Sequence, residues 1–264
     1  MTYLITLGPR LQTVASLVPA GAWLGDIGTD HAYLPIALYE ARKIFKAVAV
    51  DVHEGPFQSA MAAVKGRQLE QIIDVRFGDG LMPLEAGEVN VLTLAGMGGR
   101  TMLEILAARP DVLQSVTDLI VQPQGGEGAV RSTLLNDGWR LKTEQLVREE
   151  DRTYTVIAFS RNDGWNMADL ATKACIWHQR LTPQTVKDEV SAKFPEIVEK
   201  LVWHFGPLIL EEATDLLREY LEDYSGMLRR RLDQMKRSNK LEIAEKIRDV
   251  SEELILVEGI RTWQ

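Results

Sequence analysis

Acidic and small residues follow the first two apolar runs of the chain, where they are placed to bind a polar ligand. Asp26 and Gly28 end the run that starts at Trp23, and Asp51 ends the next run. A glycine at a strand end lets backbone approach a ligand, and a carboxylate roughly 20 residues later is placed to bind a ribose diol. This spacing predicts a nucleoside site.

Three further runs also end in polar residues or glycines. After the third run, Asp79 is placed to bond an adenine amino group beside Gly80, although Gly-Asp-Gly is equally typical of a plain turn. The fourth run ends in Ala95, Gly96, Met97, Gly98 and Gly99, which predicts close backbone contact with a ligand or a tight strand-to-helix turn. The fifth ends at Gln122, either a polar contact at the strand end or a solvated residue.

The type of ligand follows from the limited number of glycines after Asp26. A dinucleotide site favours a third glycine, which is absent here, and no segment resembles the lysine-containing phosphate loop of ATPases. A nucleoside that lacks phosphates needs fewer glycines. The pattern therefore favours S-adenosylmethionine as the cofactor and leaves an NAD-dependent oxidoreductase as a disfavoured alternative.

An α/β fold would bring these residues to one edge of a sheet, because ligands bind beyond the carboxyl ends of parallel strands. We predict five parallel strands at Trp23–Ile27, Ala47–Asp51, Asp74–Phe77, Val89–Ala95 and Leu119–Gln122. Helices are predicted at Leu34–Ala41, Pro56–Gly66, Arg100–Ala108 and Glu127–Asp137, after a leading helix with Leu11, Val14, Ala15 and Val18 on one face.

Two extended runs, Trp139–Val147 and Tyr154–Phe159, follow the last of these helices. The charged segment 148–152 between them is too short for a crossover helix, so we predict a closing antiparallel hairpin. The first domain is then expected to comprise residues 1–162.

Residues 163–264 have no strand pattern and are expected to form a helical domain. Two stripes with three-four spacing, separated by the polar residues 238–240, predict an antiparallel coiled-coil hairpin. The alternative is that these stripes dock on the first domain. The stripes are Leu217, Leu221, Tyr224, Leu228 and Met235, and Ile243, Ile247, Val250, Leu254 and Val257.

The formal net charge of −8 argues mildly against a nucleic-acid partner, since cations must replace the counterions of phosphates. A local basic cluster nevertheless offers a contact surface, although such a run is also typical of a solvated helix face. It contains Arg229, Arg230, Arg231, Lys236, Arg237 and Lys240.

Other classes of protein fit the composition poorly. No apolar run approaches the roughly 20 residues of a membrane-spanning helix, and residues 1–10 have no export signal, so we expect a cytoplasmic protein without membrane contact. Cys175 is the single cysteine and the four histidines are scattered, so we expect no bound metal. We also expect a monomer.

In their order and spacing, several segments resemble the bacterial tRNA adenine-22 N1-methyltransferase family. The most specific is Asp-Ile-Gly-Thr-Asp-His-Ala-Tyr-Leu-Pro at 26–35. The others are Arg10–Ala15, Gly55–Ala60, Val75–Leu81, Ala95–Gly99, Gln122-Pro123 and His204–Pro207. Related sequences often carry Ser at the position of Thr29, Glu at that of Asp51 and Asn at that of Gln124.

This resemblance implies a Rossmann-like class I methyltransferase domain followed by a helical coiled-coil domain. It also implies that S-adenosylmethionine donates a methyl group to N1 of adenine 22 in tRNA. The residues expected to bind the cofactor are Asp26, Gly28, Asp51, Asp79, Gly80, Ala95 and Gly96. Asp30 is expected to be the catalytic residue, with the N-cap of the following helix as its structural alternative.

The N1 atom lies on the Watson–Crick edge, so the adenine must leave its stack and be held by the protein. Tyr33 is expected to stack on the base, unless it packs in the core, and His31 to orient the base. Further substrate contacts are expected from Gly98, Gln122, Arg229, Arg230 and Arg231. A small-molecule methyltransferase and a non-catalytic RNA-binding scaffold are the open alternatives.

Overall fold

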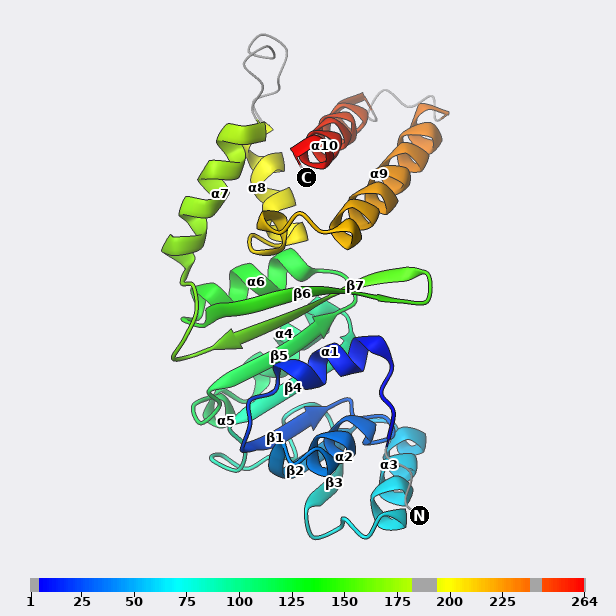
Figure 1. Ribbon diagram of the computed structural model, residues 1–264, viewed down its shortest axis with the longest axis vertical. Coiled ribbons are helices and arrows are strands. Elements are labelled where there is room, and N and C mark those ends of the chain that lie inside the picture. The colour runs from blue at the N-terminus through cyan, green and yellow to red at the C-terminus, as the bar shows by residue number, and fades with distance from the viewer. Residues whose placement is uncertain (1–4, 182–193, 238–243, 264) are drawn as a thin grey trace. The chain divides into compact units, whose positions relative to one another are not determined.

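The computed structural model describes residues 5–181, 194–237 and 244–263, and the chain divides into two compact units, 1–166 and 167–264 (Figure 1). The first unit extends past the expected boundary at 162 because Trp165 still pairs with Leu141 of the sheet through two backbone hydrogen bonds of 2.9 Å. The stretch 238–240, with Lys240, and Ile243 lie outside the described residues.

The first unit contains a seven-stranded sheet with the order β3-β2-β1-β4-β5-β7-β6. The first five strands are parallel and the last two form the antiparallel closing hairpin, as expected from the sequence. Chain order reverses between β1 and β4, and this reversal is where such sheets bind ligands. The strands are β1 Ala22–Ile27, β2 Ile44–Asp51, β3 Ile73–Phe77, β4 Val91–Met97, β5 Asp118–Pro123, β6 Arg140–Glu149 and β7 Arg152–Ser160.

Helices connect the strands and cover the sheet. Val14, Leu38 and Val64 of the first three helices join Leu24 and Ile73 of the sheet in one buried cluster, so burial of apolar surface fixes this layer. The helices are α1 Pro9–Leu17, α2 Tyr33–Glu40, α3 Glu54–Gly66, α4 Gly99–Ala108, α5 Pro110–Leu113 and α6 Glu127–Asn136. The short helix α5 was not expected.

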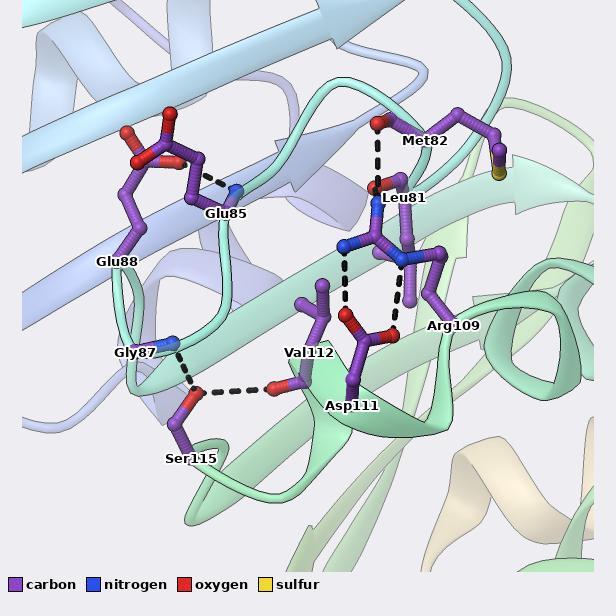
Figure 2. A network of polar contacts seen from close by, with 9 residues as sticks. All are labelled: Leu81, Met82, Glu85, Gly87, Glu88, Arg109, Asp111, Val112 and Ser115. Carbon is purple, nitrogen blue, oxygen red and sulfur yellow. Dashed lines mark hydrogen bonds and ion pairs between the residues drawn. The ribbon is translucent and has the colours of Figure 1, made fainter.

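The connection from β3 to β4 carries Asp79 and Gly80, and polar contacts hold it against α5 (Figure 2). Arg109 binds both carboxylate oxygens of Asp111, at 2.9 and 2.7 Å, and donates to the Met82 carbonyl at 3.1 Å. Farther along the connection, the Gly87 N–H donates to the Ser115 hydroxyl at 3.1 Å. The unexpected helix therefore helps to fix the path of the connection between β3 and β4.

The closing hairpin is attached to the rest of the unit by a fully buried ion pair. Arg131 Nε of α6 lies 2.7 Å from Glu144 Oε2 of β6, and both side chains have no exposed surface. A buried pair of this kind fixes how two elements pack, because removing one partner would leave a charge without compensation. The hairpin turn is also tighter than expected, since Glu149 pairs with Arg152.

The second unit is helical in all its described parts. It comprises α7 Met167–Leu181, α8 Phe194–Phe205, the 3-10 helix η1 Ile209–Glu211, α9 Asp215–Lys236 and α10 Ala244–Trp263. Helices α9 and α10 lie side by side and run in opposite directions (Figure 1). The two long helices are confirmed, and supercoiling between them stays a prediction. No helix within the described residues is long and apolar enough to cross a membrane.

Candidate active site

A pocket of about 270 Å³ lies at the carboxyl ends of β1 and β4, where the order of the strands reverses. Seven of the residues expected from the sequence line it, namely Asp26, Gly28, Asp30, His31, Tyr33, Ala95 and Gly96. Arg10, Leu11, Thr29, Leu34 and Gln124 complete the lining. The fold therefore collects residues from α1, β1, α2, β4 and the loops after β1 and β5 at one concave surface.

Asp26 lies at the buried base of this pocket, with 5 % of its surface exposed. Its two oxygens accept hydrogen bonds from the hydroxyls of Thr29, at 2.6 Å, and Thr93, at 2.7 Å. Burial raises the pKa of the Asp26 carboxyl, the two hydroxyl bonds act in the opposite direction, and the charge of Asp51 raises it further. The pocket thus contains a carboxyl group whose ionisation is energetically costly.

The loop after β1 is held in an unusual backbone conformation. Asp30 and Ala32 have φ angles of 56° and 53°, in the left-handed region that non-glycine residues seldom adopt. The Asp30 N–H donates to Asp51 Oδ2 at 3.1 Å, and the Ala32 N–H donates to the Thr29 carbonyl at 3.1 Å. Strained backbone held by surrounding bonds is common at functional sites, and the candidate catalytic residue lies on it.

Asp30 does not cap the following helix. The N-cap of α2 is Ala32, and no side chain accepts a capping hydrogen bond there. The Asp30 carboxylate is instead 69 % exposed, with His31 Nε2 at 3.5 Å from Oδ1. The structural alternative considered for Asp30 is therefore wrong, and the carboxylate is available to a ligand.

His31 and Tyr33 form an aromatic pair at the pocket. Their rings are stacked, with centroids 5.0 Å apart and an interplanar angle of 16°. Tyr33 is 45 % exposed, so it is not a core residue and its alternative interpretation is also wrong. An exposed aromatic face beside a carboxylate is suited to hold a planar base.

Gly28 in the pocket and Asp51 beside it have features that suit a nucleoside cofactor. At Gly28, φ is +74° and a Cβ atom would lie 2.9 Å from the Met97 methyl group, so both the backbone angle and the available space favour glycine. Asp51 does not line the pocket but accepts the N–H of its lining residue Asp30. It is nearly buried, and each of its carboxylate oxygens accepts one backbone N–H, from Asp30 and from His53. Each carboxylate oxygen keeps a second lone pair for a ribose hydroxyl.

The residues expected to contact adenine lie outside the pocket lining, after β3. Asp79 is exposed, and its carbonyl accepts the Met82 N–H at 3.0 Å in a turn. Gly80 is buried with φ +53°, and a Cβ atom there would lie 2.8 Å from Ile105 of α4. The turn interpretation therefore explains Gly80, while the exposed Asp79 carboxylate keeps its expected cofactor role as a prediction.

The glycines after β4 have different tasks. Gly96 is the residue at which the register with β5 shifts, and its φ of +79° suits only glycine well. Gly98 is the N-cap of α4 and does not line the pocket. Gly99 packs so closely on the next loop that a Cβ atom would lie 2.8 Å from the Gly125 carbonyl.

Gln122 differs from its expected role. It is completely buried, so the solvated alternative is wrong, and it presents no exposed atom to a substrate. Its Oε1 accepts hydrogen bonds from Arg10 Nη1 at 2.8 Å and from the Gly96 N–H at 3.1 Å, and its Nε2 donates to the Pro123 carbonyl. Gln122 therefore positions two residues of the pocket.

Sequence reasoning did not assign Arg10 to the site. Its Nε lies 3.2 Å from Glu149 Oε2 of β6, and its guanidinium lies 5.6 Å from the centre of the Tyr154 ring. The hydrogen-bond partners Gln122 and Glu149 lie more than a hundred residues away in the chain, so local spacing gives no signal for these contacts. The segment Arg10–Ala15 resembles the family but does not indicate that the Arg10 side chain enters the pocket.

Arg229, Arg230 and Arg231 of the basic cluster are exposed on α9. Arg229 Nη2 donates to Glu258 Oε1 of α10 at 2.7 Å, so part of its charge is balanced within the unit. Between residues 229 and 237, five basic residues and one acidic residue give this half of α9 a local positive charge. The expected contact with tRNA phosphates stays a prediction.

Comparison with known proteins identifies the family to which the chain belongs. Residues 7–157 match the family described as a methyltransferase domain, so the chain belongs to the methyltransferases. Over 159 residues, or 60 % of this chain and 67 % of the relative, it is 38 % identical to the tRNA (adenine(22)-N(1))-methyltransferase of Bacillus subtilis. The chain is a member of the tRNA adenine-22 N1-methyltransferase family.

Solved structures extend the similarity to both units. The crystal structure of the B. subtilis m1A22 tRNA methyltransferase is similar over 98 % of this chain and 100 % of the B. subtilis chain. The TM-score is 0.78 and the sequence identity is 26 %. A putative tRNA (m1A22) methyltransferase of Streptococcus pneumoniae, in complex with S-adenosyl-L-methionine, is similar over 93 % of this chain and 98 % of the S. pneumoniae chain. That match has a TM-score of 0.70 and 30 % identity.

Proposed function

We propose that this protein transfers a methyl group from S-adenosylmethionine to N1 of adenine 22 in tRNA. The observation that carries the proposal is the exposed Asp30 carboxylate, held beside a stacked His31–Tyr33 pair at the pocket of a methyltransferase sheet. Family membership supports the adenine and the tRNA. The substrate implies action in the cytoplasm, and we propose a monomer.

When bound, S-adenosylmethionine supplies a methyl group on a positively charged sulfur, which the in-plane lone pair of adenine N1 can attack without an enzyme nucleophile. Asp26, Gly28, Asp51, Asp79, Ala95 and Gly96 would hold the cofactor. The protein's main contribution is then to fix the base in a productive orientation, which is the basis of large proximity effects.

Tyr33 presents the ring on which the extruded adenine stacks, and His31 stacks on the other face of that ring. Asp30 accepts a hydrogen bond from the exocyclic amine of the base. Methylation at N1 leaves positive charge on the ring, and the Asp30 carboxylate stabilises this charge or takes the amine proton.

A methyl-transfer assay tests the proposal. The protein is incubated with labelled S-adenosylmethionine and either unmodified tRNA transcript or free adenosine monophosphate, and the products are analysed as nucleosides. We expect N1-methyladenosine from the tRNA alone. Equal turnover of both substrates would instead indicate a small-molecule methyltransferase, and tRNA binding without any transfer would indicate a non-catalytic scaffold.

A further inference from the structure

Arg10 is the cation in the pocket lining that the mechanism above does not use. Its guanidinium is held from two sides, by Glu149 at Nε and by Gln122 at Nη1. Its Nη2 atom makes no hydrogen bond with the described residues, and the side chain is 21 % exposed. A guanidinium fixed in this way keeps donors for an anionic ligand in the pocket.

Several elements cooperate to place this side chain. The Glu149 carboxylate also accepts the Arg10 N–H at 3.2 Å, so one carboxylate binds both the first turn of α1 and its arginine. Gly8 makes room for it, because a Cβ atom at this position would lie 2.6 Å from Glu149 Oε1. The position of Arg10 is therefore determined by the hairpin, α1 and β5 together.

The order of strands indicates which part of the cofactor lies near Arg10. The carboxylate expected to bind ribose, Asp51, ends β2, and Asp79, expected to bind adenine, follows β3 at the edge of the sheet. The pocket with Arg10 lies on the other side of β2, at β1 and β4. If Asp51 binds the ribose and Asp79 binds the adenine, the remaining part of the cofactor, its amino-acid part, lies in this pocket.

That amino-acid part carries an α-carboxylate, which requires a cation or several N–H donors when it leaves water. Two acidic residues, Asp26 and Asp30, line the pocket. Among the described lining residues, Arg10 is the one with a permanent positive charge. A carboxylate would meet repulsion at either aspartate. Arg10 is the lining side chain whose positive charge complements the α-carboxylate.

We propose that Arg10 binds the α-carboxylate of the methionine part of S-adenosylmethionine, and that Glu149 and Gln122 position its guanidinium for this contact. This inference rests on the proposed function, because it presumes the same cofactor. It makes Arg10 a cofactor-binding residue that distinguishes the complete cofactor from adenosyl compounds without a carboxylate. Recognition of this kind is specific because a ligand without the carboxylate leaves the Nη2 donors of Arg10 without an acceptor in the pocket.

The test uses two ligands that share the adenosyl thioether and differ in the amino-acid part. Isothermal titration calorimetry of the full chain measures the affinity for S-adenosylhomocysteine and for 5′-methylthioadenosine, which has no carboxylate. For Arg10→Met we expect roughly ten- to hundredfold weaker binding of S-adenosylhomocysteine, as for loss of a charged hydrogen bond, and unchanged binding of methylthioadenosine.

Two further variants complete the experiment. Arg100→Met removes an arginine that is 92 % exposed and lies outside the pocket lining, and we expect it to bind both ligands like the unaltered protein. Arg10→Lys keeps the charge but cannot bond Glu149, Gln122 and a ligand in one plane. We expect it to weaken S-adenosylhomocysteine binding by a smaller factor, which provides a second measurement if Arg10→Met fails to fold.

The remaining outcomes contradict the inference in distinguishable ways. Unchanged S-adenosylhomocysteine affinity in Arg10→Met, or an equal loss for both ligands, would overturn the assignment while leaving the proposed function intact. Loss of tRNA affinity alone would assign Arg10 to a phosphate of the RNA instead. If the unaltered protein bound neither ligand, the proposed function would itself be overturned.

Discussion

The backbone N–H of Asp30 donates a hydrogen bond to Oδ2 of Asp51 at 3.1 Å. This bond connects the carboxylate expected to bind the ribose of the cofactor with the residue expected to act on the adenine. It also helps to hold Asp30 at φ 56°, where the side chain is exposed rather than used as a helix cap. Cofactor binding and catalysis should therefore respond differently to changes at these two positions.

Asp30→Asn removes the charge of the side chain and keeps the backbone bond to Asp51. We expect kcat to fall by roughly 10²- to 10⁴-fold, the usual range for loss of an acid–base group, with no change in the affinity for S-adenosylhomocysteine. Single-turnover kinetics and calorimetry measure the two quantities. In the comparison variant Asp51→Asn, kcat and the affinity for S-adenosylhomocysteine should both decrease. An Asp30→Asn enzyme with full kcat would remove the catalytic assignment.

Tyr33→Ala removes the exposed ring that stacks on His31. Because stacking of a base on an aromatic side chain contributes about 1–3 kcal/mol, we expect kcat/KM for tRNA to fall by roughly 5- to 150-fold. Tyr33→Phe keeps the ring and is the matched control, with activity near that of the unaltered protein. If Tyr33→Phe were as impaired as Tyr33→Ala, the hydroxyl group rather than stacking would be responsible.

Asp26→Asn tests the cost of the buried carboxyl. Burial raises the pKa of Asp26 in the folded protein, so its contribution to stability is fully present below the unfolded-state pKa and is lost as pH rises through the folded-state pKa. At neutral pH, ionisation of Asp26 therefore opposes folding, and the amide avoids this cost. We expect Asp26→Asn to have the higher Tm at pH 7.

Thermal unfolding of both proteins across a series of pH values measures this difference. The advantage of the Asp26→Asn protein should shrink as the pH is lowered, because the native carboxyl then becomes neutral. Binding of S-adenosylhomocysteine should decrease in the same variant, since the pocket loses an acceptor. A Tm difference that is independent of pH would show that the hydroxyl contacts of Thr29 and Thr93, rather than charge, dominate at this position.

The basic cluster on α9 predicts a change in the salt dependence of tRNA binding. Arg230→Gln combined with Arg231→Gln should reduce the slope of log affinity against log salt by about 0.7–0.9 for each phosphate that the variant no longer neutralises. Arg229→Gln should have a smaller effect, because Arg229 is paired with Glu258. Arg218→Gln, in the acidic first half of the same helix, is the control. An unaltered slope in the double variant would identify the cluster as a solvated helix face.

Periodicity and turn chemistry were sufficient to predict the five parallel strands, the closing hairpin and the long helices. The ends of β1 and β4 carry residues that line the pocket, and Asp51 at the end of β2 bonds to the Asp30 N–H, because parallel strands align their carboxyl ends. The helix α5 was missed, since four residues are too few for a periodic pattern.

The parts of the site that could not be predicted depend on contacts between distant residues. Arg10 enters the pocket through bonds to Gln122 and Glu149, and neither bond has a local signature. Asp30 just before an apolar segment is typical of an N-cap, but the bond to Asp51 holds its backbone in the left-handed region instead. In both cases tertiary hydrogen bonds overrode what the neighbouring sequence favours.

The central claim is methylation of one atom of one nucleotide. Two tRNA transcripts that differ only at position 22, with adenine in one and guanine in the other, are incubated with the protein and labelled S-adenosylmethionine, and the digested nucleosides are identified by mass spectrometry. We expect N1-methyladenosine from the adenine-22 transcript and none from the guanine-22 transcript. N1-methyladenosine from both transcripts, or from neither, would contradict the account.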